Sequence, residues 1–244
     1  MKNFILGFVL LMVANLSNAQ GRLSDHNTIG WYTTTITPRI NDKVSGHIEY
    51  QWRRNKLVKD WQQSLLRVGL NYKLNPNVTF HVGYGWIETF AYGEYPIAAV
   101  PKRFPEHRIY EQVVINAPLG KASLLHRLRL EQRWVGRLNA PTSEKANEYI
   151  YLNRLRYMPR LDVPIKGKFY AALYDEIFIG FGENIGENVF DQNRVGILAG
   201  YKAGTKFRVE AGFLNQTVQL GREVGGKNVF QYNNGMIINT YLNL

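Results

Sequence analysis

The segment LLHRLRLEQRW, residues 124–134, carries a charged side chain at every second position from residue 127 to residue 133. Successive side chains of an extended strand point to opposite faces of a sheet. One face of this segment would therefore carry Arg127, Arg129, Glu131 and Arg133. The other face would carry Leu128, Leu130 and Trp134, with Gln132 between them. The fold depends on which of these two faces meets water.

The same kind of alternation recurs along the chain between turn residues. We expect strands at 28–39, 44–55, 61–74, 78–90, 106–117, 122–136, 148–160, 167–180, 190–202, 205–217 and 228–244. These segments are longer than the about 5 or 6 residues of a usual globular strand. They match the about 9 to 11 residues, plus overhang, that a tilted strand needs to cross a bilayer.

The connections between these segments alternate between short and long. The short ones are RINDK, NPN, PLGK, LDVPIKG and AGT, which are rich in the residues that tight turns require. The long ones lie near 56–60, 91–105, 137–147, 181–189 and 218–227. Short turns at one end and longer loops at the other are typical of an outer-membrane barrel whose turns are periplasmic.

Aromatic residues flank the short turns on the apolar parity of their strands. Three turns are flanked in this way, by Tyr72 and Phe80, by Tyr157 and Phe169, and by Tyr201 and Phe207. The opposite strand ends carry Trp52, Trp86, Trp134 and Tyr149. Two such rows are typical of the aromatic girdles of a membrane barrel. We therefore expect the apolar faces to meet lipid and the charged faces to line a wet lumen.

The predicted fold is an all-β, transmembrane, antiparallel β-barrel. Backbone groups in hydrocarbon must all be paired, so the sheet has to close. Eleven segments are recognisable, but bacterial single-chain barrels have even strand numbers. We therefore expect about 12 strands, within a range of 10–12. A propeller would need four short strands in each repeat, and a soluble sandwich would have shorter strands without the girdles.

The N-terminal residues are typical of a secretory signal peptide. A basic start is followed by an apolar stretch to about Ala14 and by small residues at Ser17 and Ala19. We expect residues 1–19 to be the signal peptide and residues 20–244 the barrel domain. The chain has no Cys, which excludes a lipid anchor on Cys, disulfides and thiolate metal sites. Export argues against nucleic acid as the partner of a chain with net charge +11.

Seven strings of the sequence together resemble one known family. They are RINDKVSGHIEYQWRRN, QQSLLRVGLNY, GYGWIETFAYGEYP, PEHRIYEQ, HRLRLEQRW, YLNRLRYMPR and FDQNRVGILAGY. In this order they resemble an outer-membrane barrel family of unknown function, domain-of-unknown-function family 2490. The resemblance covers nearly all of the chain after the signal peptide. It implies a Gram-negative outer-membrane barrel with no assigned activity.

The lumen-facing parity is rich in Arg. Nine arginines are candidates for binding anions: Arg53, Arg67, Arg127, Arg129, Arg133, Arg154, Arg156, Arg194 and Arg208. In one interpretation they pair with Glu on neighbouring strands and fill the lumen. In the other, the excess of Arg lines a pore that attracts anions. A barrel of about 8 strands is filled by side chains and a much larger one leaves a channel, so both interpretations stay open.

An enzyme is the least favoured interpretation. None of the five His residues has a Ser two residues away on the same face, and the carboxylates are dispersed. We therefore expect no catalytic residue, no metal site and no cofactor. The loop at 91–105 could fold into the barrel mouth, reach a partner protein or form a rigid surface loop.

The function expected from the sequence is a narrow, anion-preferring, porin-like channel for small acidic solutes. The alternative is a plugged barrel that acts structurally or as a subunit of an outer-membrane assembly. The expected surroundings are the lipid bilayer and lipopolysaccharide of the outer membrane. Barrel-assembly machinery would act during insertion, and the C-terminal segment GMIINTYLNL is similar to the signal that it reads. We expect no nucleic-acid partner.

Overall fold

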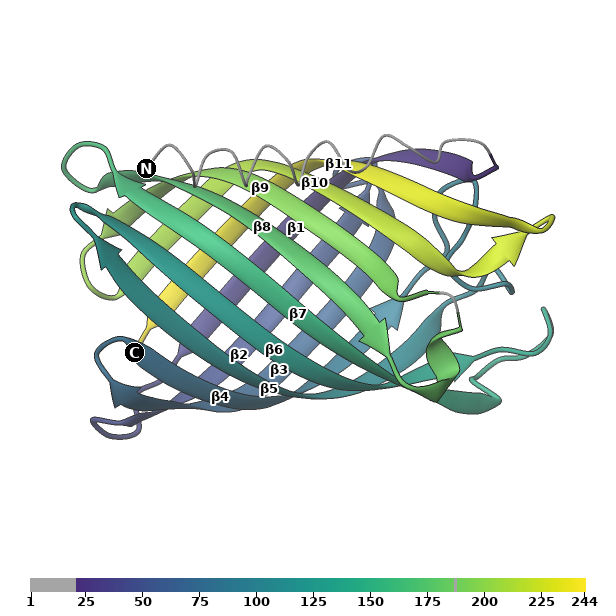
Figure 1. Ribbon diagram of the computed structural model, residues 1–244, viewed down its shortest axis with the longest axis horizontal. Helices are drawn as coiled ribbons and strands as arrows, with labels where there is room; N and C mark the ends of the chain where they lie inside the picture. The colour runs from purple at the N-terminus through teal and green to yellow at the C-terminus, as the bar shows by residue number, and fades with distance from the viewer. Residues whose placement is uncertain (1–20, 187) are drawn as a thin grey trace.

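The computed structural model describes residues 21–186 and 188–244, which form a closed all-β barrel (Figure 1). Its strands are β1 (Leu23–Thr37), β2 (Val44–Asn55), β3 (Asp60–Asn75), β4 (Val78–Thr89), β5 (Phe104–Leu119), β6 (Ala122–Arg137), β7 (Glu148–Pro164), β8 (Phe169–Phe181), β9 (Phe190–Ala203), β10 (Phe207–Val224) and β11 (Lys227–Asn243). Within these ranges a 3-10 turn, η1 (Glu183–Ile185), precedes β9, and no helix has the length and apolarity to span a membrane. The predicted signal peptide, residues 1–19, lies outside the described residues.

The barrel closes by a parallel pairing of its first and last strands. β1 and β11 stay in register from Leu23↔Val229 to Thr37↔Asn243. The other ten neighbouring pairs are antiparallel. Antiparallel neighbours alternate in direction around a barrel, so an odd number of strands leaves one pair parallel. Closure leaves no strand edge unpaired.

The described residues contain eleven strands. This number lies within the expected range, but it is one fewer than the twelve favoured by the even-number rule. The parallel seam between β1 and β11 is the physical reason why an odd number can close. A second consequence is that β1 begins at one end of the barrel and β11 finishes at the other (Figure 1).

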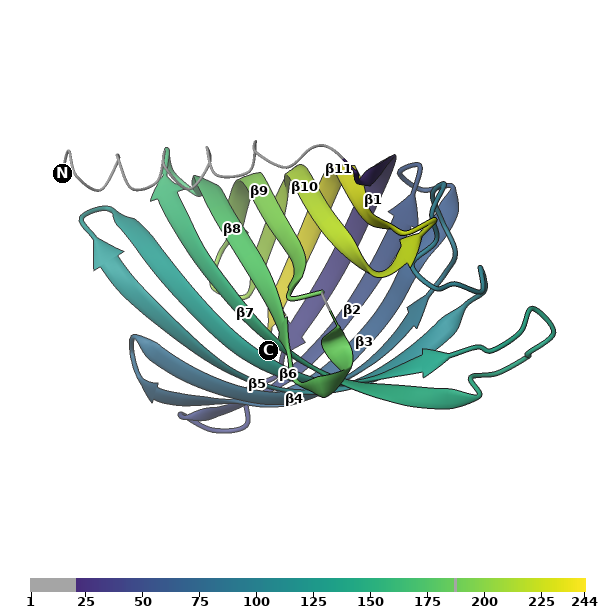
Figure 2. The same cartoon turned by 45° about the vertical axis from the view of Figure 1, so that its right-hand side comes forward.

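The two ends of the barrel differ in their connections. Short turns join the strands at the end on the left of Figure 1, for example between Leu119 and Ala122. The other end, called the long-loop end below, carries the connections after β4, β6 and β8. Figure 2 shows the loop between β6 and β7 projecting from this end.

One connection that was predicted to be long, at 218–227, is a tight hairpin. β10 continues to Val224, and only Gly225 and Gly226 separate it from β11. Both glycines have positive φ, 58° and 71°, as the common two-residue hairpin turns require. The prediction ended the strand too early because the alternation is interrupted by a bulge between Gln219 and Glu223.

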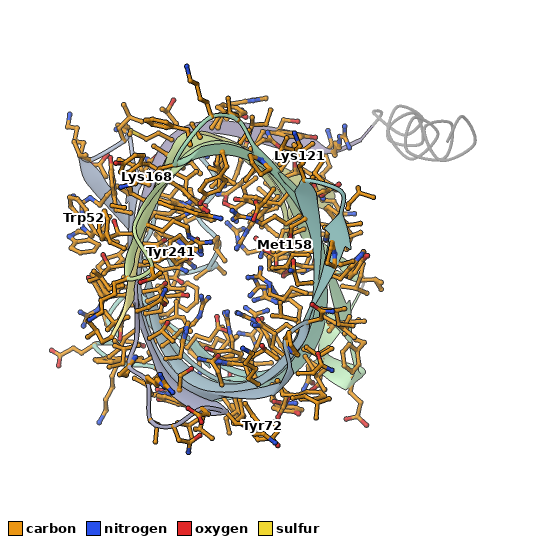
Figure 3. All side chains as sticks on the ribbon, turned by 90° about the vertical axis from the view of Figure 1, so that its left-hand side faces the viewer. Trp52, Tyr72, Lys121, Met158, Lys168 and Tyr241 are labelled. Atoms are coloured by element: carbon orange, nitrogen blue, oxygen red, sulfur yellow. The ribbon has the colours of Figure 1, made fainter. Side chains whose placement is uncertain are left out.

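The inner and outer faces agree with the predicted parity. On β6, Leu128 is 43% exposed on the outside, whereas Glu131 is 0% exposed. Exposed apolar side chains recur around the outer wall, among them Leu66, Val68, Leu70, Val82, Leu173, Ile197 and Phe213. Figure 3 looks along the barrel from the short-turn end, with Met158 and Tyr241 pointing inward and Trp52 and Tyr72 on the outside.

The aromatic residues beside the short turns lie on the outer surface. Tyr72 faces Phe80 across β3 and β4, and both are exposed. Phe169 faces Tyr201 across β8 and β9, with ring centroids 4.9 Å apart. At the long-loop end, Trp86, Tyr149 and Tyr151 are also exposed. Two rows of aromatic side chains therefore flank the apolar outer wall.

The interior is not uniformly charged. A buried apolar cluster covers the inner wall from β7 to β11 and on β1: Ile29, Trp31, Met158, Tyr170, Ala172, Tyr174, Leu198, Leu214 and Ile237. Tyr170 lies opposite Gly200, and Tyr174 lies opposite Gly196. A Cβ atom at either glycine would collide with the tyrosine ring. The missing side chain therefore lets each ring lie across the neighbouring strand.

Candidate functional site

All nine predicted arginines project into the barrel interior. Six are buried: Arg53, Arg67, Arg129, Arg154, Arg156 and Arg194. The other three, Arg127, Arg133 and Arg208, are half-buried. Contacts between strands that are not neighbours require an inward orientation. Arg127 of β6 lies 2.7 Å from Glu176 of β8, and Arg194 of β9 stacks on Trp31 of β1.

Glu131 of β6 is the centre of the interior ion-pair network. Arg154 Nη2 and Arg156 Nη1 donate to its two carboxylate oxygens at 2.5 and 2.6 Å. Arg108 and Arg129 lie 3.4 and 3.7 Å away. A buried carboxylate is tolerated only when it is paired and hydrogen-bonded. Arginines from three neighbouring strands, β5 to β7, provide that pairing.

Further interior carboxylates are paired with Arg. The pairs are Glu49 with Arg67, Glu106 with Arg108 and Arg133, Glu176 with Arg127 and Arg156, Asp191 with Arg154, and Glu210 with Arg160. The Arg160–Glu210 pair joins β7 to β10, so it reaches across two intervening strands. These pairs agree with the interpretation in which arginines brace the interior.

Arg53 and Arg194 differ from the other seven predicted arginines. Neither forms an ion pair with a residue that the structure describes. Their guanidinium groups lie 3.6 and 4.8 Å from the ring centroid of Trp31. Neutral amides hold them instead: Arg53 Nη1 donates to Gln63 at 2.7 Å, and Arg194 Nε donates to Gln192 at 3.0 Å. Neither guanidinium group is therefore in direct contact with a carboxylate of the described residues.

A cavity of about 470 Å³ lies at the long-loop end of the barrel, and these two arginines form part of its lining. Its charged lining consists of Arg53, Arg67, Arg108, Arg133, Arg137, Arg154, Arg194, Arg222, Glu106 and Asp191. Glu106 is paired with Arg108 and Arg133, and Asp191 with Arg154. Arg67, Arg108 and Arg154 also pair with Glu49 and Glu131, which lie outside this lining. Arg53, Arg194 and Arg222 have no ion-paired carboxylate among the described residues, so the lining keeps an excess of positive charge.

The loop after β4 folds into the barrel mouth, which was one of three expectations for this segment. The Tyr92 hydroxyl donates to Gln231 Oε1 of β11 at 2.8 Å. Arg222 Nη2 of β10 donates to the carbonyl oxygen of Pro96 at 2.6 Å. Burial raises the pKa of the Tyr92 hydroxyl, so this group stays protonated and can donate at neutral pH. The loop thus narrows the entrance to the cavity.

Next to the cavity floor, toward the short-turn end, the interior is lined by deeply buried rings under guanidinium groups. Phe178 is inaccessible to solvent, and the guanidinium carbons of Arg156 and Arg194 lie 4.3 and 4.4 Å from its ring centroid. Tyr110 is equally buried, with Arg129 4.4 Å from its ring centroid. We call this section the Arg–aromatic belt.

Sequence reasoning missed several charged residues of the interior, among them Arg160, Glu176 and Asp191. Arg160 shares the parity of Arg154 and Arg156, but the prediction ended that strand at residue 160, whereas β7 continues to Pro164. Glu176 lies between Tyr174 and Phe178 on the inner face of β8. Because its neighbours on that face are aromatic, the sequence carries no sign that this face points into the polar interior.

The interior histidines are engaged in packing and hydrogen bonding. His81 Nδ1 lies 2.8 Å from Asn71 Oδ1, and its Nε2 lies 3.0 Å from the Tyr110 hydroxyl. His47 Nε2 lies 3.6 Å from Glu49. In residues 21–186 and 188–244, no three His or carboxylate side chains are grouped so that they could hold a metal ion.

This chain is similar to a curated protein, a solved structure and a family model. An uncharacterized protein of Methylorubrum extorquens is 27% identical over 200 residues, which cover 78% of each chain. A solved structure of NanC porin is similar over 88% of this chain and 98% of its own, with a TM-score of 0.49 and 12% identity. The family described as "Protein of unknown function (DUF2490)" matches residues 28–224. Because the match covers most of the sequence, the chain belongs to this family.

Proposed function

We propose that this chain is an outer-membrane barrel that forms a narrow, anion-preferring channel for small acidic solutes. The observation that carries the proposal is the cavity at the long-loop end, with its eight arginines and two carboxylates. Rings of Arg attract anions at close quarters. The low-dielectric wall of a barrel strengthens that attraction. Transport, not catalysis, is the activity that this lining supports.

The outer wall supports placement in a membrane. Its apolar side chains are exposed on most strands, for example Leu66, Leu173 and Phe213. Exposed apolar patches of this extent mark membrane or protein contacts. Aromatic rows at both ends fit the two bilayer interfaces. In this placement the short turns face the periplasm and the long loops face lipopolysaccharide, after export by residues 1–19 and insertion by barrel-assembly machinery.

The distribution of arginines gives an anion successive contacts through the barrel. Arg53 and Arg194 would meet an anion in the cavity. The half-buried Arg127 and Arg208 lie nearer the short-turn end. Passage between these pairs requires side chains of the Arg–aromatic belt to move aside.

The second candidate is a plugged barrel that serves structurally or as a subunit of an outer-membrane assembly. The paired arginines and the buried Phe178 and Tyr110 favour it, because these side chains fill much of the central section. In that case the interior ion pairs would maintain the shape of the barrel, and no solute would cross.

Swelling of proteoliposomes separates the two candidates. Refolded protein is reconstituted, and osmotic swelling is recorded in isotonic potassium lactate, with valinomycin to carry potassium, and in isotonic arabinose. The channel predicts swelling faster than that of protein-free liposomes, and faster in lactate than in arabinose. Swelling at the protein-free rate in both solutions, with insertion verified by protease protection, would favour the plugged barrel.

A further inference from the structure

We infer that the cavity at the long-loop end is a binding site for a monocarboxylate with an apolar body, whose carboxylate is held by Arg194 and Arg53. This inference rests on the proposed function in placing the site on a transport path. It adds a chemical class of ligand to that path. Three features of the cavity carry it: two arginines without an ion-paired carboxylate, the amides that hold them, and the apolar side chains of the upper wall.

The first feature is the pair of arginines on Trp31. Two guanidinium groups lie within 5 Å of one indole ring, at 3.6 and 4.8 Å, without an ion-paired carboxylate among the described residues. Two like charges beside one ring in a low-dielectric interior repel one another. Cation–π contacts with the ring offset part of that repulsion. An anion bound in the cavity, which both arginines line, would offset the rest.

The second feature is the set of amides that orient these arginines. Gln192 Oε1 accepts from Arg194 Nε at 3.0 Å and from Gln216 Nε2 at 2.7 Å. Among the described residues, nothing accepts a hydrogen bond from Arg194 Nη1 or Nη2. Arg53 is fixed by Gln51 and Gln63 in the same way. Amides position a guanidinium group without neutralising its charge. Nη1 and Nη2 of Arg194 are therefore free to donate to a carboxylate. Arg–carboxylate pairs are commonly bidentate.

The third feature is the upper part of the cavity. Its walls carry aliphatic and aromatic side chains of the inserted loop and of several strands, beside the charged Arg137 and Arg222: Ile97, Val100, Phe104, Leu138, Ile150, Val218 and Leu220. A volume of about 470 Å³ is in the range of small-molecule sites. An inorganic anion or a polyhydroxylated acid would leave this apolar wall unused. A single carboxylate attached to an aromatic or aliphatic body matches both the floor and the wall.

Calorimetry with 4-phenylbutyrate tests the site. The refolded wild-type barrel in a non-ionic detergent is titrated with 4-phenylbutyrate, with its amide 4-phenylbutyramide, and with acetate; detergent alone corrects for partitioning. We expect 4-phenylbutyrate to bind at least about tenfold more tightly than either comparison compound, because each lacks one half of the match. Equal affinity for the acid and the amide would overturn the role of the arginines.

Variants locate the binding in this cavity. Arg194→Gln should weaken 4-phenylbutyrate binding by about tenfold or more. Arg39→Gln is the matched control, since Arg39 is exposed in the short turn between β1 and β2, at the opposite end of the barrel, and pairs there with Asp42. It should change the affinity by less than about twofold. If Arg194→Gln does not fold, Ile97→Asn in the loop tests the apolar wall instead. This variant should weaken the binding of 4-phenylbutyrate but not the binding of acetate.

Failure of this site and failure of the channel have different signatures. If proteoliposomes swell in lactate, but the barrel binds 4-phenylbutyrate no more tightly than 4-phenylbutyramide after correction for detergent, the site is overturned and the channel is not. A barrel that binds the acid through Arg194 but stays impermeable leaves the site and overturns the channel. Binding that is unchanged in both Arg194→Gln and Ile97→Asn overturns the location proposed here.

Discussion

Glu131 and Arg194 show two ways in which this interior accommodates a buried charge. Glu131 is surrounded by guanidinium groups, and its two nearest are at 2.5 and 2.6 Å. Arg194 has an aromatic ring and an amide as neighbours, but no ion-paired carboxylate among the described residues. The first arrangement is complete without a ligand and stabilises the barrel. The second is incomplete, which makes Arg194 a candidate for function.

Replacing Glu131 should destabilise the barrel strongly. Glu131→Ala removes the carboxylate that pairs with the buried positive charges of Arg154 and Arg156. Breaking a buried ion pair on one side costs about 3–5 kcal/mol. Urea unfolding in lipid vesicles, followed by tryptophan fluorescence, measures this loss.

The matched control is Glu148→Ala, which removes a carboxylate from an exposed pair with Arg137 at 3.7 Å. An exposed pair contributes about 0–1 kcal/mol, so the unfolding midpoint should barely move. Similar midpoints for Glu131→Ala and Glu148→Ala would show that the network around Glu131 does not brace the barrel.

At the scale of single elements, the seam between β1 and β11 determines how the barrel closes. Fifteen register pairs hold the two strands in parallel. A parallel pair is slightly less stable per residue than an antiparallel one, and length compensates here. Because the sequence contains no Cys, an engineered pair of Cys residues across this seam has no native thiol to compete with it.

A disulfide should form across the seam at Thr34 and Thr240, which are register partners. Neighbouring strands are about 4.8 Å apart, close to the Cα separation that a disulfide requires. Thr34→Cys with Thr240→Cys should therefore cross-link under mild oxidation, seen as a mobility shift on non-reducing gels that reductant reverses.

The control pair is Ser24→Cys with Thr240→Cys, because Ser24 faces Phe230 at the other end of the seam. This pair should stay reduced. A cross-link in the control, or none in the test pair, would contradict the parallel register.

The strands could be predicted from sequence because their alternation has a strict period of two. Eleven segments, the inward parity of nine arginines and the outward aromatics all followed from that period. The closing pair could not be predicted, since nothing local in β1 specifies a parallel neighbour. Partners such as Arg160 and Glu210 were also beyond prediction, because contacts across the lumen depend on the tilt and stagger of the whole barrel.

The inserted loop shows the same limit for irregular segments. Residues 91–105 left three placements open. The choice among them depends on contacts with distant strands, such as Tyr92 with Gln231 and Arg222 with Pro96. Hydrogen bonds of this kind have no periodic signature in either partner. The cavity that carries the proposed function was therefore not predictable, although its arginines were.

At the scale of the whole molecule, charge and apolarity are arranged in opposite ways on the two sides of one sheet. The wall is apolar outside and mainly charged inside, and the interior itself has an apolar side formed by β7 to β11 and β1. The net charge of +11 is thus concentrated in part where a solute would pass. This arrangement is the basis for expecting a preference for anions.

The most direct test of that expectation is the reversal potential of the refolded barrel in a planar bilayer, under a gradient of potassium chloride. The account predicts discrete conductance steps and a reversal potential displaced toward the chloride equilibrium potential. Combined Arg127→Ala and Arg129→Ala should reduce the displacement, because two interior positive charges are lost. A silent bilayer with protein shown to be folded and inserted, or a reversal potential displaced toward potassium, would contradict the anion-preferring channel.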